Sequence, residues 1–438
     1  MRELVLFNAR LVDADTDAPG AVLVRDSRIA GIVTTDRADS TDSIHKGLTG
    51  LCGTEFESVD CRGLTLMPAF IDMHTHFRYP GQSEKETLET GLRAAVAGGY
   101  GAVVTMPNTK PPVSDPETAR RIREEAAAYG LAEVFQTLSI TEGQMGETLS
   151  PLESLEGIPV VSEDGKDVED PSLLIGAFRL CARSGALVAC HCEDSSLSRA
   201  ARVYASPALS RLAEDAATVR NLALADAAGA GGPKSRIHIC HVSTETSLEA
   251  VAQAKARDLS AVSCEVTPHH LALSTDGEDS PRPANQSPRP VNPPLRRASD
   301  RSALVRGIAS GLVDVIATDH APHTAADKGA GAPGFPGLET AFAVCNTALV
   351  HGGVITLGRL SELMSAAPAR LLGLDHERGR LREGFLADLV LLAPGESWTV
   401  EGARFFTKGK GSPFEGMTLT GRVRGLWLRG ERVFPFSR

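Results

Sequence analysis

The stretch Ile71-Asp72-Met73-His74-Thr75-His76-Phe77-Arg78 decides how the rest of the chain is interpreted. It is a largely apolar run that ends in two histidines one residue apart, ahead of the turn-forming Pro80-Gly81. In a β-strand alternate side chains share a face, so His74 and His76 would point the same way and could bind one ion. Imidazole is a ligand of zinc and similar divalent metals. A His-x-His pair alone could equally be two buried or surface histidines, so the downstream sequence has to decide.

The sequence that follows alternates short apolar runs with longer helical segments, a texture typical of βα units. We expect eight of the runs to be strands, at residues 70–76, 102–106, 134–139, 159–163, 187–191, 236–241, 261–266 and 314–319. We expect helices at residues 117–129, 171–184, 213–228, 246–257 and 300–310. Eight strands with intervening helices are the count of a (β/α)8 TIM barrel, an α/β fold.

Both ends of the chain have a different texture, with short β-like pieces separated by turn residues. The pieces lie at residues 4–7, 21–25, 29–33 and 64–66 and again at 384–392 and 421–434, with a helix expected at 361–372. We therefore expect residues 1–66 and 374–438 to join in one small β-sandwich domain, and residues 67–373 to form the barrel.

Three loops are expected. Residues 34–58, rich in Ser, Thr, Asp and Gly, predict a surface loop. Residues 275–294 and 320–338 each follow a late barrel strand, and loops of this kind are either substrate lids or flexible decoration.

Composition limits the classes of function. The chain has 438 residues, of which 42% are hydrophobic and 23% charged, and a formal net charge of -10. This charge argues against nucleic acid or an anionic membrane as a partner. The N-terminus lacks the sections of a signal peptide and no apolar run has the length of a membrane span, so we expect a cytoplasmic protein.

The eight cysteines are scattered through the chain, and we expect them to be reduced. Cys190-His191-Cys192 has the composition of a metal cluster, but a strand would place both sulfurs on the face opposite His191. We interpret Cys190 and Cys192 as core residues.

Polar residues occur at the carboxyl ends of the expected strands, where active sites of such barrels lie. They are His74, His76, His191, His241 and Asp319. With Asp164, which follows the fourth strand, they form a nitrogen and oxygen set that could hold one metal ion or a bridged pair. Glu163 is the rival of Asp164, because strand alternation would place only one of the two carboxylates inward.

Such a centre indicates hydrolysis of an amide or ester. Metal-bound water loses a proton near neutral pH, and the hydroxide can attack a carbonyl. Asp319 could take up the hydroxide's proton as general base and deliver it to the departing nitrogen as general acid. Arg78, on the same strand face as His76, could bind a substrate carboxylate or form an ordinary surface salt bridge. Asn108, after the second strand, could bond the substrate or make a turn.

Several motifs together resemble class I dihydroorotase of the amidohydrolase superfamily. They are residues 72–78 followed by Pro80-Gly81-Gln82, then Ala97-Gly98-Gly99, Met106-Pro107-Asn108-Thr109, His191-Cys192-Glu193-Asp194, His241-Val242-Ser243-Thr244, Val291-Asn292-Pro293-Pro294-Leu295-Arg296 and Ala317-Thr318-Asp319-His320-Ala321-Pro322-His323. The similarity runs from about residue 60 to residue 393. Hydantoinases and allantoinases share several of these motifs, and Arg78 with Met-Pro-Asn-Thr is the more specific part.

The resemblance implies a site and a reaction. Metal ligands would be His74, His76, His191, His241 and Asp319, with Asp164 bridging, and the metal would be one or two zinc ions per chain. The substrate would contact His76, Arg78, Asn108, Asn292 and His323, with the backbone at Pro333 and Gly334 closing over the ring. The reaction would be the reversible cyclisation of N-carbamoyl-L-aspartate to L-dihydroorotate and water, in pyrimidine synthesis. We expect a homodimer, and a complex with aspartate carbamoyltransferase could accompany activity.

The chain departs from the family pattern at two positions. Tyr79 replaces an acidic residue, and Glu163 stands where a second aspartate is common. Lys166 is kept as an alternative metal bridge of the carboxylated type found in hydantoinases. Two other functions stay open: hydrolysis of a hydantoin or allantoin, and a non-catalytic partner of aspartate carbamoyltransferase.

Overall fold

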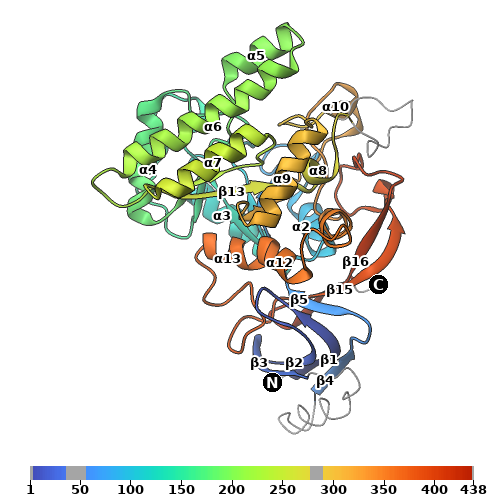
Figure 1. Ribbon diagram of the computed structural model, residues 1–438. Helices are drawn as coiled ribbons and strands as arrows, with labels where there is room; N and C mark the ends of the chain where they lie inside the picture. The colour runs from blue at the N-terminus through green and yellow to red at the C-terminus, as the bar shows by residue number, and fades with distance from the viewer. Residues whose placement is uncertain (1–2, 36–55, 277–289, 437–438) are drawn as a thin grey trace.

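The computed structural model describes residues 3–35, 56–276 and 290–436. Most of the expected loop at 34–58 and the middle of the one at 275–294 lie outside these ranges. Within them, the helices and strands are arranged as two parallel sheets with helices around them and one larger sheet beside them (Figure 1). None of the described helices is both long and apolar enough to cross a membrane.

The larger sheet is built from both ends of the chain, as expected. Its strands follow the order β17-β16-β15-β5-β1-β2-β3, and β4 pairs with β1. Their bounds are β1 Glu3–Val12, β2 Asp17–Arg25, β3 Arg28–Thr34, β4 Phe56–Asp60, β5 Thr65–Pro68, β15 Leu389–Thr399, β16 Thr418–Leu428 and β17 Glu431–Phe434. Antiparallel pairing of β15 with β5 joins the two ends.

The parallel strands form a set of three, β6-β7-β8, and a set of six, β14-β13-β12-β11-β10-β9. Their bounds are β6 Phe70–Thr75, β7 Tyr100–Thr105, β8 Glu133–Gln136, β9 Leu138–Ser139, β10 Val160–Ser162, β11 Leu187–Cys190, β12 Arg236–Ile239, β13 Ala261–Val266 and β14 Val315–Ile316. The expected strand at 134–139 is thus two strands, and each pairs with a different sheet. At the other end of the order, an isolated parallel bridge joins Thr75 to His320.

Helices lie between the parallel strands along the chain. Their bounds are α2 Leu88–Ala97, α3 Pro116–Ala127, α4 Pro171–Ser184, α5 Ser195–Val203, α6 Pro207–Gly229, α7 Glu245–Arg257, α8 Pro268–Ala272, α9 Ala298–Ser310, α10 Ala325–Gly329, α11 Ala341–Cys345, α12 Leu357–Ser361 and α13 Ala367–Leu371. Helix α3 packs against β8, α4 against β11 and α7 against β13. The expected helix at 361–372 is covered by η3 (Glu362–Ala366) and α13.

Local signals explain why α4 begins and ends where the sequence indicates. The Asp170 side chain accepts a hydrogen bond from the Ser172 backbone N–H, and Pro171 occupies the first turn. Gly185 ends the helix in the left-handed conformation, with φ of 76°.

Alternate residues of the parallel strands face two different apolar clusters. In β10, for example, Val160 belongs to one cluster with Ile71 and Met73, while Val161 belongs to the cluster that includes the helices. Burial on both faces is typical of parallel sheets covered by helices. The strands therefore have a fixed register, and their carboxyl ends meet at one edge.

Three sequence expectations about element bounds are wrong. Residues 56–58 of the expected loop belong to β4, which pairs in parallel with β1. The strand expected at 384–392 begins only at Leu389, because Gly384 has φ of 85° and turns the chain beside β3. The strand expected at 314–319 is reduced to two residues, since the Asp314 carboxylate accepts from the Cys264 N–H and Asp319 has φ of 48°.

Candidate metal centre and active site

The six residues expected to bind metal meet in one buried cluster. Nε2 of His74 lies 3.2 Å from Oδ1 of Asp164, and Nε2 of His76 lies 3.1 Å from Oδ1 of Asp319. Oδ1 of Asp164 also lies 3.6 Å from Nδ1 of His191 and 3.9 Å from Nε2 of His241. All six side chains are buried. The carboxyl ends of five separate strands therefore deliver imidazoles and carboxylates to one point, as the sequence predicts.

The cluster has the chemistry of a cation site. Among the described residues, Nε2 of His74 and Oδ1 of Asp164 are buried without a hydrogen-bond partner. Burial alone would lower the pKa of His74, but Asp164 and Glu265 raise it well above its usual range. Burial likewise opposes a charge on His191, yet Asp164 and Glu193 raise its pKa to about 10. The side chains thus stabilise positive charge at their centre, and nitrogen and oxygen donors of this kind fit a divalent ion such as zinc.

The geometry separates Asp164 from its rivals. The Glu163 carboxylate accepts hydrogen bonds from the backbone N–H and the hydroxyl of Thr141, away from the histidines. Lys166 donates from Nζ to the carbonyl of Gln144 at 2.8 Å. Of these three residues, only Asp164 contacts the imidazoles.

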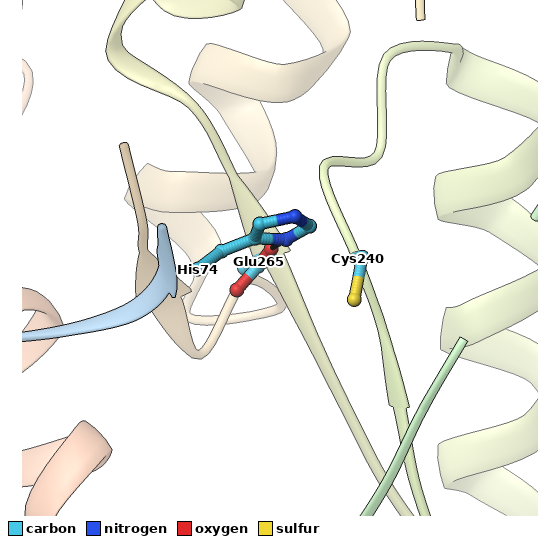
Figure 2. Close-up of side chains that lie close together, drawn as sticks. All are labelled: His74, Cys240 and Glu265. Carbon is cyan, nitrogen blue, oxygen red and sulfur yellow. Dashed lines mark hydrogen bonds and ion pairs between the residues drawn. The ribbon is translucent and has the colours of Figure 1, made fainter. Parts of the chain in front are cut away.

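Glu265 is a member of the site that the sequence analysis missed. One of its oxygens, Oε1, lies 2.7 Å from Nδ1 of His74, and the other lies 3.1 Å from Nε2 of His238. Figure 2 shows Glu265 on β13 and Cys240 just past the end of the neighbouring β12, beside the His74 ring. Carboxylates that bind the second nitrogen of a metal-ligating histidine fix its tautomer and orientation. The sequence did offer one sign of this role, because Glu265 is a charged residue within the otherwise uncharged strand β13.

The two asparagines expected to contact substrate also contact the metal-binding side chains. Oδ1 of Asn108 lies 2.9 Å from Nδ1 of His76, and its Nδ2 donates to Asp164 at 2.9 Å. Nδ2 of Asn292 donates to the Glu193 carboxylate at 2.7 Å. Glu193 in turn lies 3.0 Å from Nε2 of His191. Both amides therefore help to orient the side chains of the cluster.

Arg78 lies beside the cluster, and no carboxylate of the described residues pairs with it. Its guanidinium forms no ion pair with any carboxylate in the described ranges, and it approaches the carbonyl of Pro322 at 3.4 Å and Nε2 of His323 at 3.3 Å. Burial lowers the pKa of Arg78. Within the part of the chain that the structure describes, the donors of Arg78 are therefore not used by a salt bridge, which favours the interpretation that they bind an anionic group.

His323, Pro333 and Gly334 lie together next to Arg78. Nε2 of His323 donates to the carbonyl of Pro333 at 2.7 Å, and burial together with the charge of Arg78 lowers the pKa of His323 to about 4. Gly334 has φ of 126°, and a β-carbon there would lie 2.8 Å from the carbonyl oxygen of Ala321. The loop at 320–338 thus folds back on itself against the site, with the short helix α10 inside it.

Three residues of the site have backbone angles that non-glycine residues rarely adopt. Arg78, His241 and Asp319 have φ of 57°, 34° and 48°. Such strain concentrates at functional sites, where the surrounding fold enforces it. A cavity of about 760 Å³ lies on the side of Glu193 and Asn292, and its lining also includes Gln144, Lys166 and Pro333.

Cys190 and Cys192 are core residues, as expected. All seven cysteines within the described ranges are free and buried, and Cys190 and Cys192 belong to the main apolar cluster while His191 faces the site. Cys52 lies outside the described residues.

The chain is similar to known proteins over nearly its whole length. The model of the Amidohydrolase family matches residues 65–433. The dihydroorotase of Clostridium botulinum (strain Eklund 17B / Type B) is 36% identical over 424 residues, covering 96% of this chain and 96% of that protein. The dihydroorotase of Lactiplantibacillus plantarum is 40% identical over 381 residues, covering 84% and 86%.

Solved structures show the same architecture. The L-hydantoinase (dihydropyrimidinase) of Arthrobacter aurescens superposes with a TM-score of 0.83 at 26% identity, covering 99% of this chain and 96% of that chain. The dihydropyrimidinase of Brevibacillus agri superposes with a TM-score of 0.78 at 23% identity, covering 98% and 95%, and this likeness concerns the fold.

Proposed function

The chain belongs to the amidohydrolase family and, within it, groups with the dihydroorotases, and from this membership we propose that it is a zinc-dependent dihydroorotase. The reaction is the reversible conversion of N-carbamoyl-L-aspartate to L-dihydroorotate and water, in pyrimidine synthesis. The observation that carries the assignment is the pairing of a buried histidine and aspartate cluster with Arg78, a half-buried guanidinium that has no carboxylate partner among the described residues.

His74, His76, Asp164, His191, His241 and Asp319 would hold the metal. When bound, one or two zinc ions polarise the substrate carbonyl and lower the pKa of water. Asp319 serves as the proton carrier. Burial opposes its ionisation, but the hydrogen bond with His76 and the neighbouring imidazoles lower its pKa to about 2.

An ionised Asp319 can therefore receive the proton of the attacking water at neutral pH. As the ring amide C–N bond breaks, the departing nitrogen takes this proton, the second proton of the water is released to solvent, and the products are a carboxylate and a ureido group. Cyclisation uses the same groups in reverse and releases water.

Arg78 would bind the carboxylate that dihydroorotate and carbamoyl aspartate share. Its planar donors match a carboxylate, and burial strengthens the pair because water competes less. His76, Asn108, Asn292 and His323, with the backbone at Pro333 and Gly334, would form the remaining contacts around the ring.

Architecture and assembly form the second part of the proposal. The cyclic order of the parallel strands and the bridge between Thr75 and His320 support a (β/α)8 barrel at residues 67–373. The sheet built from both ends supports a β-sandwich formed by residues 1–66 and 374–438. We further propose a homodimer and a complex with aspartate carbamoyltransferase, which size-exclusion chromatography at micromolar concentration tests with and without that enzyme.

The rival function is hydrolysis of a hydantoin or allantoin. Lys166 hydrogen-bonds to Gln144 and does not contact the cluster, which disfavours the carboxylated-lysine centre of hydantoinases. Arg78 favours a substrate that carries a carboxylate.

The test measures metal content and dihydroorotate hydrolysis on one sample, before and after chelation. Activity that disappears with the metal and returns with zinc supports the proposal. Bound metal without dihydroorotate turnover would instead assign another cyclic amide, and absence of metal would favour the non-catalytic partner.

A further inference from the structure

A segment from the C-terminal part of the chain lies against residues 319–323, the part of the active-site loop that follows β14. We name residues 405–411, which follow η4 (Gly402–Arg404), the C-terminal strap. Two acidic side chains from the barrel bind its backbone. Glu339 accepts from the N–H groups of Phe406 at 2.8 Å and Thr407 at 3.1 Å, and Glu86 accepts from the N–H of Lys408 at 3.2 Å. The Thr407 hydroxyl also donates to Glu86. Carboxylate acceptors make these hydrogen bonds stronger than neutral ones.

Glu86 connects the strap to the centre of the site. Its Oε2 lies 3.5 Å from Nε2 of His320, and both side chains are fully buried. His320 directly follows Asp319, and its carbonyl accepts from the backbone N–H of His76 at 2.8 Å. Nδ1 of His320 accepts from the N–H of Gly337 at 3.1 Å. One continuous set of contacts therefore runs from Thr407 to the backbone of two residues of the metal centre.

The strap also touches the substrate side of the loop, through a glycine. A β-carbon at Gly409 would lie 2.7 Å from Cβ of Pro322 and 3.0 Å from the backbone nitrogen of His323. Real side chains do not approach so closely, and the contacted atoms are rigid, so the backbones can meet only because residue 409 has no side chain. Gly411, two residues along the same strap, is different: a β-carbon there would have only Lys328 Cγ within contact distance, at 3.9 Å.

We propose that the C-terminal strap positions the active-site loop 319–323, with Gly409, Thr407 and Glu86 as its positioning residues. The strap holds His323 opposite Arg78 and holds His320 beneath Asp319, so the C-terminal end of the chain determines how substrate is bound although it carries no reacting group. This inference rests on the proposed function for its kinetic consequences alone. Its structural consequence, the order of the loop, is independent of which substrate is used.

The decisive comparison is Gly409→Ala against Gly411→Ala. Neither glycine has a left-handed backbone, so the two substitutions differ mainly in the space that surrounds them. Amide hydrogen exchange over residues 318–335 is measured in zinc-loaded full-length protein without substrate, together with metal content, KM and kcat for dihydroorotate.

In G409A we expect faster exchange in the loop and a KM raised about tenfold, because small displacements of positioning groups weaken substrate contacts. Metal content should stay unchanged, and G411A should match the original protein in every measurement. Equal behaviour of the two variants, whether both altered or both unaltered, would overturn the inference.

A second pair of variants applies if G409A does not fold. Thr407→Val removes the hydroxyl that donates to Glu86 while keeping the side-chain shape, and Thr407→Ser keeps the hydroxyl. We expect faster loop exchange in T407V and recovery in T407S. Loop exchange in T407V equal to that of the original protein would contradict the role of the strap. If the original protein shows no dihydroorotate turnover, the proposed function fails, but the exchange measurements still decide the role of the strap.

Discussion

The Glu265 carboxylate lies 2.7 Å from Nδ1 of His74, on the side of the imidazole opposite to Asp164. Because Nδ1 is occupied by this bond, Nε2 is the nitrogen directed into the cluster. Glu265 accepts from Nε2 of His238 at 3.1 Å and from the backbone N–H of His241 at 3.3 Å as well. A single buried carboxylate thus orients two side chains, from β6 and β12, and one backbone N–H just after β12.

We predict that Glu265→Gln weakens zinc binding by about 10- to 100-fold, the usual effect of losing a carboxylate behind a metal-ligating histidine. The glutamine amide can still accept from His74, but its NH2 group would face the donor on His238. Competition with a chromogenic chelator, without substrate, measures the affinity. Glu163→Gln is the matched control, because Glu163 is a buried carboxylate near the same strand ends that accepts hydrogen bonds from Thr141 instead of a histidine. Similar losses in both variants would contradict the role of Glu265.

Asp319→Asn should lower kcat for dihydroorotate by about 10²- to 10⁴-fold, the range associated with loss of a general acid–base group. Asparagine keeps the size of the side chain but cannot carry the proton. Single-turnover measurements on samples with measured zinc content separate this effect from loss of metal. A zinc-replete D319N variant with kcat within a factor of about three of the original would exclude the proton-carrier role.

Arg78→Ala should raise KM for dihydroorotate about 100-fold and leave zinc content unchanged, because removal of one partner of a buried charge pair costs about 2–5 kcal/mol. Arg78→Lys should be intermediate, since lysine keeps the charge but not the planar pair of donors. Arg93→Ala on α2 is the control, as Arg93 pairs with Glu89 at the surface. Unchanged KM in R78A would show that the carboxylate binds elsewhere.

Glu339, which binds the C-terminal strap, makes stability depend on pH. Burial raises the pKa of Glu339 from 4.5 to about 7. Between these two pH values the folded state therefore binds more protons than the unfolded state. The contribution of Glu339 to the free energy of unfolding is present below pH 4.5 and is lost as the pH rises to about 7.

Glu339→Gln should remove this part of the pH dependence. At 1.36 kcal/mol per pKa unit, the shift from 4.5 to about 7 gives an upper limit of about 3.4 kcal/mol, and the effect is smaller because the side chain is only partly buried. Urea unfolding at pH 5 and pH 8 measures it as the difference between the original protein and E339Q. If both proteins showed the same pH dependence of unfolding, Glu339 would not be the group responsible for it.

Periodic burial made the helices and strands of the central part of the chain predictable. The helix expected at 171–184 has those bounds as α4, because Asp170 and Gly185 carry strong local signals for its two ends. The run at 134–139 was recognised as β-structure, but nothing in its residues shows that it divides into β8 and β9 and pairs with two different sheets. Pairing depends on neighbours that are distant in sequence.

Residue type and position at strand ends determined most of the candidate site. His74, His76, His191, His241 and Asp319 each end an apolar run, and parallel strands bring their carboxyl ends to one edge. The sequence also determined that Arg78 lies two residues beyond His76, and the family to which the chain belongs follows from these same residues. The expectation that Arg78 shares a strand face with His76 is wrong, because β6 ends at Thr75 and Arg78 has φ of 57°.

Only the tertiary structure decided between Asp164 and Glu163, which are adjacent and chemically alike. Their difference is the direction in which the chain turns after β10, and this direction is set by packing against Thr141 and Asn108. Glu265 and the C-terminal strap also became visible only in three dimensions. Their partners, His74 and the loop at His320, are separated from them by 191 residues in one case and by more than 80 in the other. Local sequence records which groups a residue offers, whereas the packing of distant strands decides which of those groups meet.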